Sequence, residues 1–289
     1  MCGNGVGGGC LRIARRVGGS GQALGRRRQR NRHVSSVAGS VGNPTIILVS
    51  ADWLPSCPAL LFDSRMKVSV VIPTLNEGPR IAELIAATSA LSPHEIVVVD
   101  GGSEDDTVAN ASAADVVVEC DRGRSVQQNA GAARCSGDVI LFLHADCQLT
   151  DGFVQAIADC LTNDDCVGGC FRQKIDNAGK RFRAVEWGNS MRVRLLGWGY
   201  GDQGIFVRRG VFEQIGGFPD VTFMEDLLLA KRLGKAGRFV LLQHDIHASC
   251  RRWQRTGVVR QTLQNWFFVS LAHCGVSPNW LARFYPHVR

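Results

Sequence analysis

From residue 66 onward, short apolar runs alternate with segments in which apolar residues recur at helical spacing. Each apolar run predicts a strand covered on both faces, and these runs are 67–73, 94–100, 115–120 and 138–146. The segments between them predict helices at 78–91, 103–113 and 124–137. Strands that alternate with helices form right-handed crossovers. The pattern therefore predicts an α/β fold with a mostly parallel central sheet and helices on both faces.

Polar residues gather where three of these strands end. They are Pro73, Asn76 and Glu77 after the first strand, Asp100 and Ser103 after the second, and His144 and Asp146 after the fourth. In "VILFLHADCQL", His144 and Asp146 stand at i and i+2, so on a strand they would point the same way. A turn or a helix cap accounts for each residue singly, and capping is favoured for Ser103. Three such ends at one edge of a parallel sheet predict a ligand-binding crevice.

The end of the chain, 256–289, combines aromatic and basic residues. The aromatic residues are Trp266, Phe267, Phe268, Trp280 and Phe284, and the basic residues near them are Arg260, Arg283 and Arg289. This pattern is typical of an amphipathic helix, which could lie on a membrane or pack on its own domain. No apolar run in the sequence reaches the roughly 18 residues that a helix needs to cross a bilayer.

The net charge is unevenly distributed along the chain. The total is +7, and residues 1–65 hold nine Arg against Asp52 and Asp63, so residues 66–289 are neutral overall. Residues 1–65 are also rich in Gly and lack apolar periodicity, which predicts a disordered tail. A translated region upstream of a start at Met66 is the favoured explanation, ahead of a genuine disordered tail and an Arg-rich organelle transit peptide. A neutral folded part gives no reason to expect a nucleic-acid partner.

Three familiar kinds of site are not favoured by the sequence. Residues 3–8, "GNGVGG", match GxGxxG, but no predicted strand precedes them and no helix follows. The motif GxxxxGK[ST] is absent, so P-loop or kinase chemistry is not expected. The eleven cysteines lack paired CxxC spacing, and the nearest pair, Cys166 and Cys170, lies in a predicted strand approach rather than a zinc loop. Reduced, mostly buried thiols of a cytosolic protein are the simpler interpretation.

Six separated blocks occur in the order and at the approximate spacing of one known family. They are "VSVVIPTLNE", "IVVVDGGSEDDT", "GRSVQQNAGA", "DVILFLHAD", "GDQGIFVRR" and "MEDLLLAKRL". Over residues 67 to about 255 the chain resembles the family 2 glycosyltransferases of GT-A fold, in particular a bacterial branch with H-A-D in place of D-x-D. The resemblance implies one domain at 66–289. Within it, 66–150 would be a Rossmann-like nucleotide-sugar half, 151–255 an acceptor half and 256–289 a C-terminal amphipathic helical segment.

The resemblance also implies a donor site at the strand ends. Its expected residues are Pro73, Asn76, Glu77, Asp100, Ser103, Arg124, Asn129 and His144. The first three would border the nucleoside, and the Asp100 carboxylate would accept hydrogen bonds from the base or ribose. Arg124 and Asn129 would lie beside the diphosphate, because a guanidinium matches phosphate oxygens. A solvated helix residue is the alternative for Arg124.

A Mg²⁺ or Mn²⁺ ion is implied as well, to neutralise charge on the diphosphate. Asp146 is the expected ligand, and His247 is a further candidate that could also contact phosphate. His144 departs from the family pattern, in which an Asp is usual. We expect its imidazole to donate a hydrogen bond to the ribose or the diphosphate. A metal contact, which would favour Mn²⁺, and a strand-end cap are the alternatives.

On the acceptor side, Trp198 and Tyr200 would stack on a sugar or line an apolar groove, and Asp202 and Gln203 would supply hydrogen bonds. Core packing is an equal alternative for Trp198.

The segment "FMEDLLLAKRLGKAG" predicts a helix that begins with Glu225 and Asp226, whose charges complement the helix dipole. By resemblance this pair supplies the general base. We assign Asp226, with Glu225 as its rival, because consecutive helical residues point about 100° apart. Ser249 stands where processive relatives carry Gln, so synthesis of a long polymer is less expected.

Together these implications predict an inverting, metal-dependent glycosyltransferase that uses a nucleotide-diphosphate sugar and a hydroxyl acceptor, which a lipid or a carotenoid-like molecule could carry. The expected location is cytoplasmic, with peripheral contact at the cytoplasmic face of a membrane if the acceptor is a lipid. A non-catalytic nucleotide-sugar binding protein is one alternative. Nucleotidyl transfer is another, disfavoured because it needs a Gly-rich basic loop after the first strand, where "PTLNEGPR" offers only Gly78 and Arg80.

Overall fold

The protein is represented by a computed structural model that describes residues 66–285. The predictions for residues 1–65 and for Arg289 lie outside this part of the chain. Within residues 66–285, no helix is long and apolar enough to cross a membrane.

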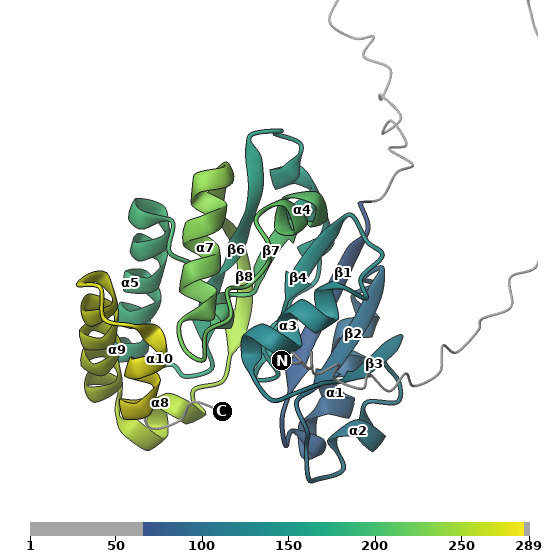
Figure 1. The fold of residues 1–289 in the computed structure, drawn as a ribbon, viewed down its shortest axis with the longest axis horizontal. Coiled ribbons are helices and arrows are strands. Elements are labelled where there is room, and N and C mark those ends of the chain that lie inside the picture. The colour runs from purple at the N-terminus through teal and green to yellow at the C-terminus, as the bar shows by residue number, and fades with distance from the viewer. Residues whose placement is uncertain (1–65, 286–289) are drawn as a thin grey trace, which may run out of the picture. The chain divides into compact units, whose positions relative to one another are not determined.

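Eight strands of the described residues form one sheet in the order β3-β2-β1-β4-β7-β6-β8-β5 (Figure 1). The first half of the chain supplies β1 (Val68–Thr74), β2 (Glu95–Asp100), β3 (Val116–Glu119) and β4 (Val139–Phe142). The second half supplies β5 (Cys147–Leu149), β6 (Cys166–Ile175), β7 (Ile205–Arg208) and β8 (Arg238–Ala248). Strands β1 to β4 run parallel, as predicted. The β7 strand is antiparallel to β4 and β6, β6 and β8 are parallel, and β5 is antiparallel to β8, so the sheet as a whole is mixed.

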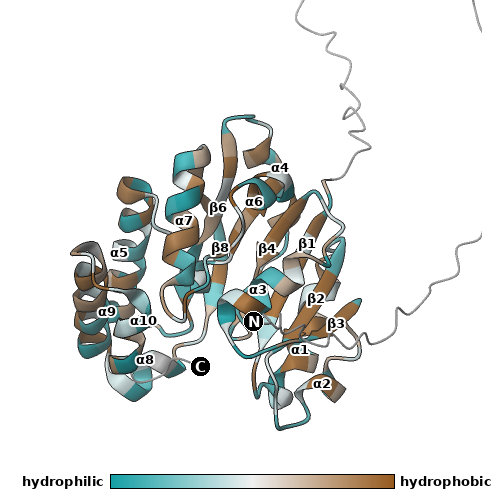
Figure 2. Ribbon diagram, viewed as in Figure 1, coloured by the Kyte–Doolittle hydropathy of each residue, from teal (hydrophilic) through white to brown (hydrophobic). Residues whose placement is uncertain are grey.

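Helices cover both faces of the sheet, which confirms the predicted α/β class. On one face, α1 (Gly78–Ala90) and α4 (Phe153–Leu161) bury apolar side chains such as Ile81 and Phe153 against the strands. On the other face, α3 (Arg124–Ala132), α6 (Arg209–Gln214) and α7 (Glu225–Ala236) do the same with residues such as Phe212 and Leu229. Strands β1, β2 and β4 are mostly apolar, as Figure 2 shows, because neither of their faces meets water.

The remaining helices connect or extend these layers. They are α2 (Thr107–Asn110), α5 (Lys180–Leu196), η1 (Gly201–Gln203), α8 (Arg251–Thr256), α9 (Val258–His273), α10 (Pro278–Leu281) and η2 (Ala282–Phe284). The α5, α8 and α9 helices pack together around Phe182, Trp253 and Val258.

Three predicted elements are shorter than the sequence pattern indicated. The helix expected at 103–113 is only α2, because the preceding polar residues form a turn with the β1 loop. The helix expected at 124–137 ends at Ala132. The strand expected to reach Asp146 ends at Phe142, so the prediction that His144 and Asp146 point the same way from a strand is wrong. They follow the strand in a turn, in which the His144 carbonyl accepts a hydrogen bond from the Cys147 amide at 3.0 Å.

A glycine brings α3 unusually close to the sheet. A side chain at Gly131 would collide with Val71 on β1 and Val99 on β2. Because no larger residue fits there, the helix lies directly on these strands. Its first residue, Arg124, is thereby placed near the carboxyl ends of the parallel strands.

Candidate active site

The loops that follow β1 and β2 are bound to each other by their own polar side chains. The Asp100 carboxylate accepts hydrogen bonds from the amides of Gly102 at 2.9 Å and Ser103 at 2.7 Å. The Ser103 hydroxyl accepts the Asn76 amide at 2.8 Å, and the Asn76 side chain accepts the Glu104 amide at 2.9 Å. The interpretation of Ser103 as a helix cap is wrong, because α2 begins later, at Thr107. These bonds fix the edge at which the predicted donor residues lie.

Pro73 and Glu77 lie at the same edge. Pro73 is paired with Val99 in the β1–β2 ladder and is partly exposed. Glu77 is buried directly before α1, and its amide donates to the Thr107 hydroxyl at 2.8 Å. The ends of β1, β2 and β4 are therefore adjacent, as the sequence predicted, since these three strands are neighbours in the sheet.

An ion pair joins the start of α3 to the start of α7. The Arg124 guanidinium lies 3.6 Å from Oε1 of Glu225, which is almost fully buried and has no hydrogen-bond partner at that atom. Burial raises the pKa of Glu225 to about 7; Asp226 adds to the rise and Arg124 opposes it. Burial also lowers the pKa of Arg124, but the charges of Glu225, Asp226 and Asp146 outweigh this and raise it. Arg124 therefore faces the acids of the site, which argues against a merely solvated helix residue.

Asp226 and His144 meet across η1. The Gly201 amide donates to Oδ2 of Asp226 at 3.0 Å, and the same oxygen lies 3.9 Å from Nε2 of His144. Oδ1 of Asp226 and Nε2 of His144 are buried without hydrogen-bond partners. A side chain at residue 201 would collide with both His144 and Asp226, so only glycine fits there.

His144 is held in its neutral form. Burial, and then the positive charge of Arg124, lower its pKa, while Asp226 and Asp146 oppose that change. The His144 ring lies beside Asp226, the candidate base, rather than a backbone group at the strand end, so the structure does not support a strand-end cap. Its hydrogen bond to a donor ribose or diphosphate stays a prediction.

The predicted acceptor residues lie together between α5 and β7, and Arg192 organises them. Its guanidinium donates to the Trp198 carbonyl at 2.9 Å and to the Gln203 side chain at 2.8 Å, and it stacks 3.5 Å from the centre of the Tyr200 ring. Lys231 lies 4.8 Å over the Trp198 ring. Trp198 is thus half-buried under a cation and is not a core residue.

A chain of side-chain hydrogen bonds links Arg192 to Asp202. Arg192 donates to Asn189 at 2.7 Å, Asn189 donates to Gln173 at 2.7 Å, and Gln173 donates to Oδ2 of Asp202 at 2.8 Å. Oδ1 of Asp202 stays buried and without a hydrogen-bond partner. The sequence did not identify Arg192, Asn189 or Gln173 as site residues. Nothing in the run "VEWGNSMRVRLL" distinguishes Arg192 or Asn189 from its neighbours, and Gln173 lies in a separate segment.

The two predicted metal ligands line one cavity. Asp146, which is exposed, and His247 border a hollow of about 200 Å³, together with Asp176, Arg80 and Arg251. Nδ1 of His247 lies 3.1 Å from the Asp176 carboxylate, which orients the ring. No group of three or more His, Cys, Asp or Glu residues among those described is close enough to hold a metal ion by itself. Carboxylate oxygens with one imidazole nevertheless fit Mg²⁺ or Mn²⁺, which need only one or two protein ligands.

The loop between α6 and α7 is held by α3 on one side and by the C-terminal segment on the other. From α3, the Asn129 amide bonds the backbone of Phe218 at 3.0 and 2.9 Å, and Ser125 donates to the Val221 carbonyl at 3.0 Å. Asn129 is therefore engaged by the protein, and its role beside the diphosphate stays a prediction. From the C-terminal segment, Tyr285 packs on Phe223 with ring centres 4.6 Å apart. Sequence reasoning missed this contribution, since no pattern links residues so far apart.

Comparisons with known proteins show similarity to glycosyltransferases in sequence and in fold. The model of the family described as Glycosyl transferase family 2 matches residues 69–215, about half of the chain, and ends before α7. An undecaprenyl-phosphate 4-deoxy-4-formamido-L-arabinose transferase of Sodalis glossinidius is 31% identical over 156 residues, which are 49% of this chain and 48% of that protein. Glycosyltransferase AglE of Haloferax volcanii is 30% identical over 202 residues, 62% of this chain and 65% of its own. The chain thus spans about half to two thirds of the length of these relatives.

Solved structures support the fold. The crystal structure of S. aureus TarS 1-349 in complex with UDP-GlcNAc superposes with a TM-score of 0.51 at 18% identity, over 64% of this chain and 58% of that one. Because the identity is low, this similarity concerns the fold, which is that of the GT-A glycosyltransferases. The family match, the strand ends and the sheet lead to one conclusion: this chain belongs to glycosyl transferase family 2.

Proposed function

We propose that this protein transfers a sugar from a nucleoside-diphosphate donor to the hydroxyl group of an acceptor, with inversion at the anomeric carbon. The observation that carries the proposal is the environment of Asp226. One carboxylate oxygen is held by the Gly201 amide, and the other is buried without a partner. A carboxylate fixed in this way can accept a proton from a hydroxyl group brought against its free oxygen.

The proposed step is a single displacement. The acceptor oxygen forms a bond to the anomeric carbon while its proton passes to Asp226. The bond between that carbon and the diphosphate oxygen breaks, and its electron pair leaves with the nucleoside diphosphate. A positioned base contributes about 10²- to 10⁴-fold, or roughly 3–5 kcal/mol of the barrier.

Other residues of the crevice would bind and orient the substrates. Arg124 would bind the diphosphate, and the ordered loops around Asp100 would bind the nucleoside. Asp146, with His247, would hold a Mg²⁺ or Mn²⁺ ion, whose chemistry is to neutralise charge that develops on the leaving diphosphate. Trp198, Tyr200 and Asp202 would contact the acceptor, with Asp202 offering its unpartnered oxygen for a hydrogen bond.

The substrate class that we favour is a lipid-linked acceptor. With such an acceptor, the protein would make peripheral contact with a membrane. Several relatives are undecaprenyl-phosphate 4-deoxy-4-formamido-L-arabinose transferases, and undecaprenyl phosphate is a lipid. For a hydroxyl acceptor, Asp226 is needed as a base. A lipid phosphate, by contrast, is already deprotonated at neutral pH, since its second pKa is about 6. The size of the Asp226 effect therefore distinguishes the two acceptor chemistries.

The full chain should be incubated with a panel of nucleotide sugars and Mn²⁺, with and without hydroxyl lipids and lipid phosphates, while release of nucleoside diphosphate is measured. We expect release above background for one donor, and transfer when the right acceptor is added. Donor binding without any release would indicate the non-catalytic binding protein instead. Pyrophosphate release from a nucleoside triphosphate and a sugar phosphate would indicate nucleotidyl transfer.

A further inference from the structure

The α9 helix carries an apolar stripe on its outer side. Val259, Leu263, Trp266 and Phe267 recur at helical spacing and are each about 60% exposed. The inner side holds Gln261, whose side chain is buried and bonds Asn265 at 2.9 Å. A helix on the surface of a globular protein normally places its polar residues outward. The four large apolar side chains on the exposed side of α9 indicate that this face meets something other than water.

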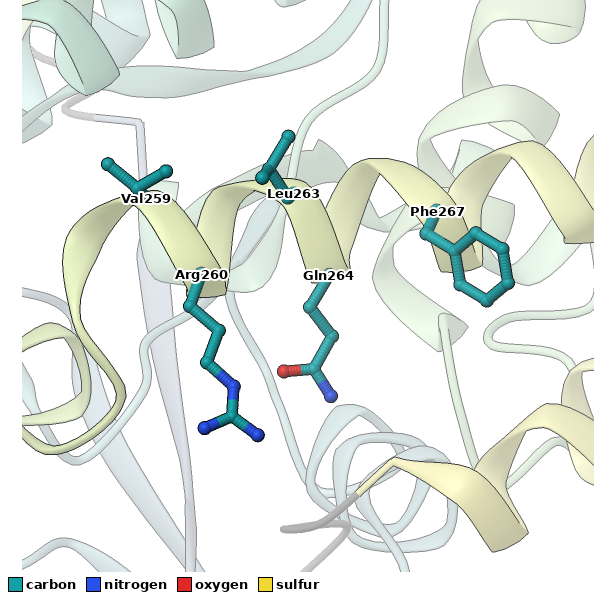
Figure 3. Close-up of a pocket in the computed structure, with 5 residues that line it drawn as sticks. All are labelled: Val259, Arg260, Leu263, Gln264 and Phe267. Atoms are coloured by element: carbon teal, nitrogen blue, oxygen red, sulfur yellow. The ribbon is translucent and has the colours of Figure 1, made fainter.

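The stripe borders a shallow hollow of about 600 Å³ lined by residues of α9 alone. Figure 3 shows Val259 and Leu263 on one side of the helix, Arg260 and Gln264 on the other, and Phe267 farther along. Arg260 thus extends beside the apolar residues with its guanidinium free of contact with acids in this hollow.

The apolar surface continues onto the helices beside α9. The exposed rings of Trp280 on α10, which contacts α9, and of Phe284 on η2 have centres 4.5 Å apart. On α5, which also contacts α9, Trp187 and Leu195 are about 70% exposed. Figure 1 shows α5, α9 and α10 together at one end of the molecule. We call these exposed residues of α5, α9, α10 and η2 the aromatic surface.

The charged side chains around the aromatic surface share one sign. The exposed charged residues on α5 and on the helices from α8 through η2 are Lys180, Arg181, Arg183, Arg194, Arg251, Arg255, Arg260 and Arg283. The acid of α5, Glu186, is buried and is bonded to the Ile175 amide and to Arg183. The sequence from 251 to 285 contains no Asp or Glu. Although residues 66–289 are neutral overall, this end of the molecule is strongly positive.

We propose that the aromatic surface docks on an anionic phospholipid bilayer. Exposed Trp, Phe and Leu side chains insert at the headgroup boundary, and Arg side chains beside them pair with lipid phosphates while their stems stay among apolar groups. A second copy of the chain is a poorer occupant, because two such positive surfaces would repel each other. The inference deepens the lipid-acceptor part of the proposed function.

Docking at this surface would bring the bilayer close to the catalytic acids. The inner side of α9 presents Phe268, which packs on Phe223 with ring centres 5.9 Å apart, and Phe223 stands two residues before Glu225. The α9 helix therefore carries the aromatic surface on its outer side and packs on its inner side against the segment that leads into α7. The proposal therefore places the bilayer next to the segment that carries the candidate base.

The test is co-flotation of the full chain with vesicles of phosphatidylcholine, with and without phosphatidylglycerol, in the absence of donor and acceptor. We expect binding that needs the anionic lipid. Leu263→Gln combined with Phe267→Gln should weaken it about tenfold, and Arg260→Gln about fivefold. Val126→Gln, which changes an exposed apolar residue of α3, is the matched control and should bind like the unchanged protein.

A second readout distinguishes this surface from the Arg-rich residues 1–65, which could adsorb to anionic vesicles by charge alone. Lipids with brominated acyl chains should quench the tryptophan fluorescence, and Trp266→Phe should remove a large part of that quenching. Absence of vesicle binding, or binding and quenching that the α9 variants leave unchanged, would overturn the proposal. Sedimentation showing a dimer that Leu263→Gln with Phe267→Gln dissociates, without vesicle binding, would assign the surface to a second copy. Because no sugar is transferred in these measurements, their failure would leave the proposed chemistry standing.

Discussion

The two sides of the crevice differ in how many of their polar side-chain atoms are hydrogen-bonded within the protein. On the donor side, Asp100, Ser103 and Asn76 are bonded to each other and to backbone amides. On the other side, which holds the proposed acceptor residues, the acidic pair and His144, buried polar atoms lack hydrogen-bond partners. These atoms are His144 Nε2, Asp202 Oδ1, Gln203 Nε2, Glu225 Oε1 and Asp226 Oδ1.

The difference separates a scaffold from a reaction centre. The described residues contain seven buried side-chain atoms without hydrogen-bond partners. Five of them lie on this side, and the other two belong to Gln128 of α3. Each unsatisfied buried group costs roughly 1–3 kcal/mol. A fold that keeps several of them in one place gains nothing in stability, so we infer that they are kept for a substrate. In this proposal the loops of the donor side are ordered before the substrate binds, and the buried atoms of the acceptor side form their hydrogen bonds with the substrate.

The largest effect is expected where the two sides meet, at Asp146. Asp146→Ala should remove Mn²⁺ binding and lower metal-dependent turnover by about 10³-fold, because a carboxylate holds the ion better than an imidazole does. His144→Ala should retain a measurable fraction of turnover. Calorimetric titration with Mn²⁺ measures binding independently of activity. Loss of Mn²⁺ binding in His144→Ala but not in Asp146→Ala would reverse the assignment.

A smaller effect is expected from Gly201→Ala. The added methyl group would collide with His144 and Asp226 and displace the candidate base, so turnover should fall by roughly 10- to 10²-fold. Gly234→Ala in α7 is the matched control, because that position faces open space and should be neutral or slightly stabilising. Steady-state kinetics and thermal melts of both variants check this. Normal turnover in Gly201→Ala would show that the close packing of η1 is unimportant for the chemistry.

Arg192→Lys tests how the acceptor side is shaped. A lysine cannot bond Trp198, Asn189 and Gln203 at once while stacking on Tyr200, so the acceptor segment should lose its order. We expect the KM for the acceptor to rise about tenfold while donor affinity stays nearly unchanged. Arg194→Lys on the same helix, where the side chain is exposed, should have little effect. Equal effects of the two variants would contradict a positioning role for Arg192.

Another expected effect concerns the dependence of stability on pH. Because burial raises the pKa of Glu225 from its ordinary value to about 7, the folded state holds this proton more tightly than the unfolded chain does. That stability is complete below about pH 4.5 and is lost as the pH rises through 7, by at most about 3 kcal/mol. His144 works oppositely, since its lowered pKa costs stability as the pH falls below about 6.5.

Glu225→Gln should therefore flatten the loss of stability between pH 5 and 8. Urea unfolding of both proteins at these two pH values measures the change. An unchanged slope in the variant would mean that Glu225 is ionised throughout, paired with Arg124.

The strand ends of the proposed donor side could be predicted from the sequence, but little of the arrangement on the proposed acceptor side could. Continuous apolar runs identify β1, β2 and β4, and their polar ends identify Asn76, Asp100 and Asp146, because these signals are local. The pairing of β7 between β4 and β6 is not local, and it decides where Asp202 lies. The bonds of Arg192 and the packing of Tyr285 on Phe223 depend on the folded arrangement of distant segments. Sequence patterns carry no record of them.

The proposed chemistry depends on transfer of the acceptor's proton to Asp226. It is tested most directly by turnover of Asp226→Asn and Glu225→Gln at saturating donor and acceptor, with donor affinity measured separately. Asp226→Asn keeps the shape of the side chain and removes its basicity, so turnover should fall by at least about 10²-fold with donor affinity nearly unchanged. Near-normal turnover in Asp226→Asn together with an inactive Glu225→Gln would make Glu225 the base. Full activity in both variants would contradict the account, leaving the acidic pair as no more than the start of a helix.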